Sequence, residues 1–377
     1  MPNSYWLEEP GPELVGETLD GTPDIEIVGA GITGCSAALT LAEAGLRVRV
    51  HEARAVAEGA SGRNGGFALR GGAMPYNRAR EWLGADEARA LWTLTERALE
   101  RLAVVVGDAL RPVGSLGLAN DDEEREELRV EYEALREDGF QAEWREPLWP
   151  PLDRRFAAAI FHPPDAAVQP ARMTRRLAGQ AAGRGVEFVQ HHRVESLDEL
   201  ASDSVLVATD GYPSGLLGEF EGLIVPTRGQ MIATEPIAER LFDCPHYGRH
   251  GFHYWQQLED GRITAGGFRD VDMTSEFTIE EVTTPTIQEA LEEFLGELVG
   301  GPVQVTHRWA GIFGLVLDFL PVVGRLPGQD RVWICGGYSG HGNVLGFMCG
   351  ELIAKAMMGE ERPELALFDP QRLLAAA

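Results

Sequence analysis

The sequence predicts an α/β fold, α+β overall, in which one domain is built on a parallel sheet and a second domain on an antiparallel sheet. Three observations predict it. A strand, a glycine-rich turn, a helix and a second strand follow one another between Asp24 and Arg54. Short β-rich runs cluster between 223 and 309, and a strand, a glycine-rich turn and a helix close the chain between 331 and 359. Alternating strands and helices are typical of parallel sheets, whereas consecutive strands are typical of antiparallel ones.

The first unit has the residues that a dinucleotide-binding turn requires. The apolar run 25–28 leads into Gly29-Ala30-Gly31-Ile32-Thr33-Gly34 and a helix that ends near Ala44. Gly29 permits the tight turn, Gly31 lets the backbone approach a pyrophosphate, and Gly34 lets the helix pack closely on the sheet. The helix N-terminus then favours the negative phosphates.

An acidic residue completes this pattern. The second strand, 46–50, leads to Glu52, which lies 18 residues after Gly34. A carboxylate at about this distance accepts hydrogen bonds from the ribose hydroxyls of an adenosine. Together these features favour a Rossmann-like dinucleotide site over a chance glycine-rich turn. We therefore predict the cofactor-binding residues Gly29, Gly31, Ile32, Thr33, Gly34, Glu52, Ala53 and Arg54.

Composition excludes some functions. The formal net charge of −26 argues against a nucleic-acid partner, because phosphates need a basic surface. The four cysteines contain no CxxC pair, so neither a disulfide reductase nor a zinc site is indicated, and we expect buried thiols and no metal. The N-terminus lacks the basic and apolar regions of a signal peptide, and no run of about 20 apolar residues occurs. These absences predict a soluble, cytoplasmic protein without membrane insertion.

Hydrophobic periodicity and turn residues predict the remaining helices and strands. The helix that begins after Thr284 has Pro285 in its first turn and Gly300 at its end. Other helices are expected at 86–105, 122–137, 173–184 and 343–358, and strands at 113–118, 186–190, 205–208, 224–234, 253–258, 262–267, 303–309 and 331–335. We expect the cofactor domain to comprise 1–77, 155–222 and 310–377, and the substrate domain 78–154 and 223–309.

The order of these elements resembles the D-amino-acid-oxidase-like (DAO) family of FAD-dependent oxidoreductases over essentially the whole chain. Four segments carry the resemblance, namely 29–52, Gly59-Ala60-Ser61-Gly62-Arg63-Asn64-Gly65-Gly66, Val207-Ala208-Thr209-Asp210-Gly211-Tyr212 and Gly337-Tyr338-Ser339-Gly340-His341-Gly342. Within the family, the N-terminal segment Ser4-Tyr5-Trp6 and the sequence Gly62-Arg63-Asn64-Gly65-Gly66 look most like the γ-glutamylputrescine oxidase branch.

The resemblance implies FAD as the cofactor. A flavin is long and needs contacts at several distant points of the chain, which the separate glycine-rich turns supply. The further residues implied in FAD binding are Ser61, Gly62, Arg63, Asn64, Gly65, Val194, Ala208, Thr209, Gly211, Gly340, His341, Gly342, Asn343 and Val344. In sarcosine oxidases a cysteine carries the flavin, and its position here falls at Gly311, so we predict non-covalent FAD.

The resemblance also implies the chemistry. In this family a C–H bond next to an amine gives hydride to flavin N5, and the imine is then hydrolysed. We expect a small-molecule amine or amino acid as substrate and O2 or another electron acceptor. Thr264 stands where sarcosine oxidase has the lysine that promotes the oxygen reaction, and Phe268 where it has an active-site histidine. These two replacements therefore keep a dehydrogenase that uses a quinone or another carrier open, although an oxidase remains the expected type.

Two positions bear on the substrate. Relatives that oxidise amino acids hold the carboxylate with a cation at positions that here are Phe313 and Val344. An unpaired carboxylate beside apolar side chains costs several kcal/mol. We therefore expect a secondary or γ-glutamylated amine. Because Arg63, Arg228 or Arg269 could replace the missing anchor, an amino acid oxidase of the glycine, sarcosine or D-amino-acid type stays open.

The candidate catalytic residues are His253, Tyr254 and Arg63. The first two begin a strand of the substrate domain that is expected to face the flavin, although ordinary cross-strand packing would also explain them. Two other functions are retained. One is an NAD(P)-dependent dehydrogenase, and the other is a non-catalytic flavoprotein whose cleft is blocked by Phe268 and Phe313.

Overall fold

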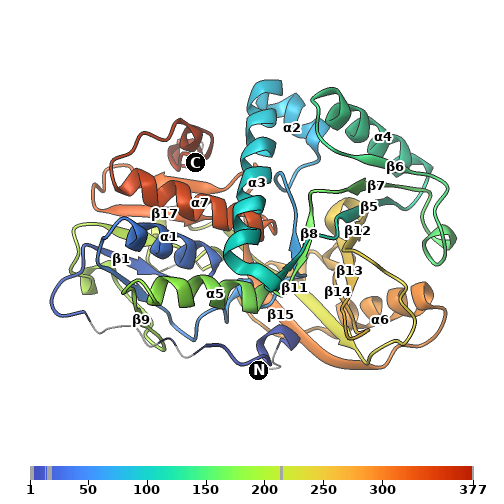
Figure 1. The fold of residues 1–377 in the computed structure, drawn as a ribbon, viewed down its shortest axis with the longest axis horizontal. Helices are drawn as coiled ribbons and strands as arrows, with labels where there is room; N and C mark the ends of the chain where they lie inside the picture. Colours follow the sequence, from blue (N-terminus) through green and yellow to red (C-terminus); the bar gives the residue numbers. More distant parts are fainter. Residues whose placement is uncertain (1–3, 13, 15–18, 213–214, 376–377) are drawn as a thin grey trace.

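The computed structural model describes residues 4–12, 14, 19–212 and 215–375. It contains a six-stranded and an eight-stranded sheet, which lie side by side, and a three-stranded sheet, β3-β8-β4 (Figure 1). Both termini of the described chain lie in the half that holds the six-stranded sheet or at its border with the other half. The strands of the small sheet are Phe67–Ala68, Ala166–Val168 and Leu110–Arg111. Residues 1–3, which begin the N-terminal arm, lie outside the described residues.

The six-stranded sheet has the order β16-β17-β10-β1-β2-β9. Its strands are β1 (Ile25–Val28), β2 (Val48–His51), β9 (Glu187–Val189), β10 (Val205–Val207), β16 (Val322–Arg325) and β17 (Val332–Gly336). All pairs are parallel except β16 with β17. The carboxyl ends of the parallel strands therefore meet at one edge, where nucleotide sites of this architecture form.

Three helices pack together on one face of this sheet, namely α1 (Ile32–Glu43), α5 (Pro170–Ala182) and α7 (Gly342–Met357) (Figure 1). The long helix α3 (Ala85–Val106) crosses α5 and α7. Residues from all four helices share one hydrophobic core. Because Gly346 and Gly350 of α7 have no side chain where they meet Thr33 and Ser36 of α1, the two helices approach closely.

The eight-stranded sheet has the order β15-β11-β14-β13-β12-β5-β7-β6. Its strands are β5 (Ser115–Ala119), β6 (Glu143–Arg145), β7 (Ala158–His162), β11 (Val225–Thr234), β12 (His246–Gly248), β13 (His253–Gln257), β14 (Ile263–Gly267) and β15 (Val305–Leu315). Every pair is antiparallel except β5 with β12.

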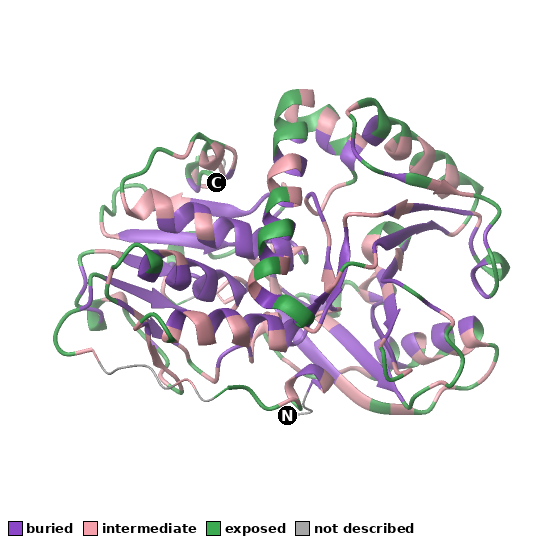
Figure 2. Cartoon of the chain, viewed as in Figure 1, coloured by how far each residue is buried: buried purple, intermediate pink, exposed green. Residues whose placement is uncertain are grey.

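Further helices cover this sheet. Helix α6 (Pro285–Val299) packs on β11 and β14, and α4 (Asp122–Glu137) packs on β5 and β7. Helix α2 (Tyr76–Leu83) lies between α3 and α4, and a short helix α8 (Gln371–Leu374) follows near the end of the chain. Strands of both sheets are coloured as buried in Figure 2, whereas α3 and α4 expose much of their outer surface.

The predicted fold class is confirmed. The structure adds α2, β6, β7, β12 and β16, which sequence periodicity does not reveal, and extends the strand expected at 303–309 to Leu315. The four cysteines are free and buried, as expected. The division into five domain pieces stays a proposal, and its last boundary, between 309 and 310, falls within β15.

Within the part of the chain that the structure describes, no helix is long and apolar enough to cross a membrane. The same residues contain no group of three or more histidine, cysteine or acidic side chains positioned to hold a metal ion.

Candidate functional site

A cavity of about 1720 Å³ begins at the carboxyl ends of β1, β2 and β10 and continues to the eight-stranded sheet. Pockets for single drug-sized ligands occupy about 300–1,000 Å³, so this cavity has room for a dinucleotide and a second molecule. Predicted site residues that line it are Gly29, Gly31, Ile32, Thr33, Glu52, Ala53, Arg54, Ser61, Arg63, Asn64, Gly65, Val194, Ala208, Thr209, Tyr254, Gly340, His341, Gly342, Asn343 and Val344.

The inner end of the cavity is built on the N-terminus of α1. Gly31 caps this helix without a side-chain hydrogen bond, and the Ile32 N–H donates to Ser61 Oγ at 2.9 Å. Glu52 accepts hydrogen bonds from the N–H groups of Ala30 and Arg54, both at 2.8 Å. These contacts hold the loops after β1 and β2 around a helix N-terminus, which is the environment that a pyrophosphate requires.

Four predicted residues do not line the cavity. Gly34, Gly62 and Gly211 lie behind it, where an added Cβ would come within 1.9 Å of Gly29 O, 2.2 Å of Ala57 O and 2.7 Å of the Phe313 carbonyl carbon. Their physical role is therefore close backbone packing that shapes the cavity wall. The fourth residue is His253, which faces away from the cavity.

The alternation of side chains along β13 separates the two candidate catalytic residues. Tyr254 faces the cavity, and its ring lies edge-on to Phe67 at 5.9 Å. His253 faces the opposite side, where its ring stacks on Phe268 at 3.7 Å and its Nε2 lies 3.4 Å from Asp270. The geometry thus argues against a substrate contact for His253, whereas Tyr254 stays a candidate.

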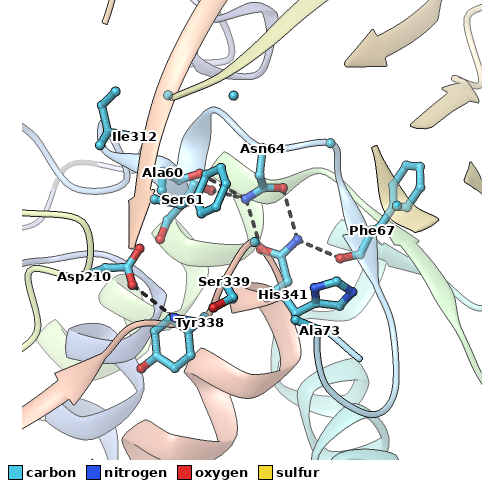
Figure 3. Close-up of a pocket in the computed structure, with 18 of the residues that line it drawn as sticks. Ala60, Ser61, Asn64, Phe67, Ala73, Asp210, Ile312, Tyr338, Ser339 and His341 are labelled. Atoms are coloured by element: carbon cyan, nitrogen blue, oxygen red, sulfur yellow. Dashed lines mark hydrogen bonds between the residues drawn. The ribbon is translucent and has the colours of Figure 1, made fainter. Parts of the chain in front are cut away.

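The glycine-rich loop 59–66 is joined to the N-terminus of α7 by a pair of amides (Figure 3). The side chains of Asn64 and Asn343 exchange two hydrogen bonds of 3.1 Å, and Asn343 also donates to Phe67 O at 2.7 Å. Two loops nearly 280 residues apart in sequence therefore form one wall of the cavity.

Asp210 was not selected from the sequence, although it lies inside the quoted turn 207–212. Its side chain is half-buried, and Oδ1 accepts from the N–H groups of Gly337 at 2.8 Å and Tyr338 at 3.4 Å (Figure 3). Oδ2 accepts from Gly314 N–H at 3.0 Å. Asp210 therefore connects β10, β15 and the turn after β17. Its position between two small turn residues and its positive φ of 48° are the signals that could have indicated it.

Two titratable side chains beside the glycine loop, His341 and Tyr254, are neutral at pH 7. Burial lowers the pKa of His341 to about 4 and raises the pKa of Tyr254 to about 12, so the imidazole is unprotonated and the phenol protonated. Burial also lowers the pKa of Arg63, whose guanidinium donates to Glu58 O at 2.8 Å and Ala310 O at 3.2 Å. Neither Tyr254 nor His341 is a strong base there, which suits a reaction that needs no strong base.

The family model for FAD dependent oxidoreductases (DAO) matches residues 24–356. The chain belongs to this family. The resemblance seen in the sequence is confirmed, and the protein is an FAD-dependent oxidoreductase. The helix N-termini, the glycine-lined wall and the cavity volume fit an extended FAD. Because the family is FAD-dependent, the alternative of an NAD(P)-dependent dehydrogenase is not retained.

Individual relatives cover nearly the whole chain. The gamma-glutamylputrescine oxidoreductase of Escherichia coli is 27% identical over 90% of this chain and 84% of its own length. The crystal structure of glycine oxidase from Geobacillus kaustophilus superimposes with a TM-score of 0.77 at 21% identity, covering 94% of this chain and 99% of that one. The structure of L-proline dehydrogenase from P. horikoshii gives a TM-score of 0.77 at 21% identity, covering 95% and 99%. At these identities the two structures show the fold alone.

The cleft is not blocked by the two phenylalanines that the sequence singled out. Phe313 lines the cavity without closing it, and Phe268 packs in the core of the eight-stranded sheet, so neither side chain blocks the cleft. Thr264 is also buried in that sheet. Non-covalent attachment stays a prediction, which is supported because Gly311 occupies the expected cysteine position and all four cysteines lie elsewhere.

The carboxylate of Glu281 contacts side chains from three segments of the predicted FAD site. Glu281 precedes α6, and its side chain pairs with Arg54 at 2.7 Å and accepts a hydrogen bond from the hydroxyl of Tyr212. Arg63 lies 3.8 Å from the same carboxylate. Arg54 follows β2, Arg63 lies in the glycine-rich loop 59–66 and Tyr212 follows β10. All of these residues and Glu281 line the cavity. Glu281 therefore forms a clasp, defined as the Arg54–Glu281–Tyr212 cluster.

Removing the clasp carboxylate should speed the loss of FAD. Hydrogen bonds to charged groups contribute about 1.5–3 kcal/mol, so Glu281→Gln should increase the FAD dissociation rate roughly tenfold or more. Flavin fluorescence released after dilution measures that rate. Glu280→Gln removes a neighbouring exposed carboxylate and should leave the rate unchanged. Equal rates in both variants would show that the clasp does not retain FAD.

Proposed function

We propose that this protein oxidises a C–N bond of an amine, with a secondary or γ-glutamylated amine as the preferred substrate. Bound FAD would accept a hydride at flavin N5 from the carbon next to the amine nitrogen, and the resulting imine would add water and separate into a carbonyl compound and the remaining amine. The chain itself binds and orients the substrate. The similarity to the gamma-glutamylputrescine oxidoreductase of E. coli supports an amine substrate.

The acidic outer half of the cavity carries this proposal. The cavity-lining residues of α4 are spaced along one helical face, and they include Glu124, Glu127 and Glu131. Glu131 accepts a hydrogen bond from Tyr76 N–H at 3.0 Å, and burial raises the pKa of its carboxyl group. A cationic amine that extends from the flavin toward α4 would meet the opposite charge of Glu124 and Glu127, and Glu131 would offer it a hydrogen-bond acceptor.

Near the flavin, the chain supplies positioning groups. Tyr254 packs against Gly65 and Gly229. An added Cβ at Gly65 would lie 3.0 Å from the tyrosine ring, and one at Gly229 would lie 3.7 Å from its hydroxyl. Phe313 also lies near Gly229, where an added Cβ would be 3.8 Å from its ring. Together the two aromatic rings exclude water and hold the reacting carbon in a fixed orientation, which is how a protein accelerates hydride transfer to a cofactor.

Anaerobic flavin reduction tests the proposal. The yellow holoenzyme is mixed with secondary amines, putrescine derivatives and amino acids, and the flavin absorbance is followed. Bleaching by at least one amine is expected, and a flavin that no member of the panel reduces would contradict the proposed function. Air is then admitted and peroxide is assayed. Peroxide at the turnover rate identifies an oxidase, whereas slow reoxidation identifies a dehydrogenase that uses another acceptor.

A further inference from the structure

Two buried tryptophans hold consecutive carbonyl groups of the glycine-rich loop 59–66. The indole N–H of Trp309, on β15, donates to Arg63 O at 2.9 Å. The indole N–H of Trp6, in the N-terminal segment, donates to Asn64 O at 2.8 Å. Trp6 and Trp309 are 2% and 0% exposed, both belong to one hydrophobic cluster, and neither is among the described residues that line the cavity. The two carbonyls therefore point into the core. We call Trp6 and Trp309 the indole pair.

A buried glutamine holds the next two carbonyls of the loop. Gln256, on β13, is 1% exposed, and its Nε2 donates to Gly65 O at 2.7 Å and to Gly66 O at 3.0 Å. Gln256, like the indole pair, lies outside the set of described residues that line the cavity. The carbonyls of four successive residues, 63–66, are therefore held by side chains behind the cavity wall.

This arrangement turns backbone N–H groups toward the cavity. The peptide units of the loop are trans, and in a trans unit the C=O and N–H bonds point in opposite directions. Since the carbonyls of Arg63 and Asn64 point into the core, the N–H groups of Asn64 and Gly65 point toward the cavity, which both residues line. Neither N–H group has an acceptor among the residues that the structure describes. By contrast, Arg63 N–H donates to Ala60 O at 3.1 Å and Gly66 N–H to Asn64 Oδ1 at 2.9 Å.

The N-terminal segment that carries Trp6 is itself fixed in place. Trp6 O accepts a hydrogen bond of 2.9 Å from Gln169, which caps α5, and Glu9 pairs with Arg172 of the same helix at 2.6 Å. Trp309 is fixed by the pairing of β15 with β11. Both indole N–H groups therefore reach the loop from rigid elements, and the orientation of the two peptide units is set before a ligand binds.

The two unpaired N–H groups suit the ring system of a flavin. A buried backbone donor requires an acceptor, and the ring of a flavin offers carbonyl oxygens and ring nitrogens. The ring gains electron density when it is reduced. Donors that are already directed toward it stabilise the reduced form more than the oxidised form, because no reorganisation is needed when the charge develops.

We propose that the indole pair positions the N–H groups of Asn64 and Gly65 as hydrogen-bond donors to the flavin and thereby raises its reduction potential. Trp6 and Trp309 are positioning residues, because they act through the loop and not by contact with the cofactor. The N-terminal segment, which the proposed function leaves without a role, thus tunes the cofactor. The inference depends on FAD binding and holds whichever amine is oxidised.

The reduction potential of the bound flavin tests this role without an amine. Trp6→Phe and Trp309→Phe keep an aromatic ring and remove the indole N–H. Each holoenzyme is reduced slowly in the presence of a redox dye of known potential, and the flavin and dye absorbances are recorded together. In each variant the ratio of reduced to oxidised flavin at a fixed potential should fall about tenfold, which corresponds to about 30 mV for a two-electron couple. Trp144→Phe is the control, since the Trp144 indole donates to Glu146 and neither residue is among the described residues that line the cavity. Its potential should equal that of the wild type.

Three results would overturn the inference. The first is a wild-type potential in both variants of the indole pair with only a lower unfolding temperature, which would leave the indoles a packing role. The second is an equal shift of the potential in Trp144→Phe. The third is a failure of both variants to retain FAD, which would assign the indoles to the fold. If only one variant folds, the other still decides, because each indole holds a different peptide unit.

The same measurement separates this inference from the proposed function. Electrons reach the flavin from the dye system, so a flavin that no amine reduces would contradict the proposed function and leave the effect of the indole pair measurable. Amine oxidation by variants with an unchanged potential would refute the inference and keep the proposed function.

Discussion

Replacing Asp210 with alanine should lower the free energy of unfolding by at least about 3 kcal/mol and weaken FAD binding, because three buried backbone N–H groups would lose their acceptor. Each unsatisfied buried donor costs about 1–3 kcal/mol. These donors belong to Gly314, Gly337 and Tyr338, and Tyr338 and the neighbouring residue Phe313 line the cavity. The loss should therefore affect both stability and the shape of the FAD site.

Urea unfolding followed by circular dichroism measures the first effect, and flavin fluorescence measures the second. Asp203→Ala is the matched control, since Asp203 is exposed and lies before the start of β10, at the end opposite to Asp210. This substitution should change the free energy of unfolding by less than about 0.5 kcal/mol. Asp210→Asn should give an intermediate loss, because the amide keeps one acceptor but turns an NH2 group toward another donor. A stability of Asp210→Ala equal to that of the control would contradict the proposed connecting role.

The sequence was most informative where the determinants are local. The strand, turn and helix between Ile25 and Glu43 follow from apolar runs and glycines that act on their immediate neighbours. The same local signals predicted α6, with Pro285 at its start and Gly300 after its end. Strand β15 was predicted too short, because Gly311 and Gly314 interrupt its β pattern, and only pairing with β11 continues it to Leu315.

Long-range pairing explains what the sequence could not show. Arg63, Arg228 and Arg269 were equivalent as candidate anchors until the structure placed Glu276 against Arg228, 48 residues away. His253 and Tyr254 were likewise equivalent, because the period of a strand gives two faces without saying which one meets the cavity. Strand β12 has only three residues, and it exists because it pairs with β5, which lies about 130 residues earlier.

Gly34→Ala should yield protein that binds FAD at least roughly a hundredfold more weakly than wild type, or not at all. A Cβ at this position would lie 1.9 Å from Gly29 O and 3.1 Å from Gly29 C, which are backbone atoms of the turn that must pass beneath the pyrophosphate. The clash cannot be relieved by turning a flexible side chain. Either α1 must move away from β1, or the turn must move into the space of the phosphates.

Gly179→Ala provides the control for this substitution. Gly179 lies in the interior of α5, which packs on α1, and its nearest neighbour for an added Cβ is a Pro12 side-chain atom at 3.8 Å. Alanine there should stabilise the helix by about 0.5–1 kcal/mol and leave FAD bound. The absorbance of the purified proteins near the flavin maxima, with circular dichroism to confirm folding, compares the two variants. If Gly34→Ala were as yellow and as stable as Gly179→Ala, the close approach of α1 to the turn would not be required for the cofactor site.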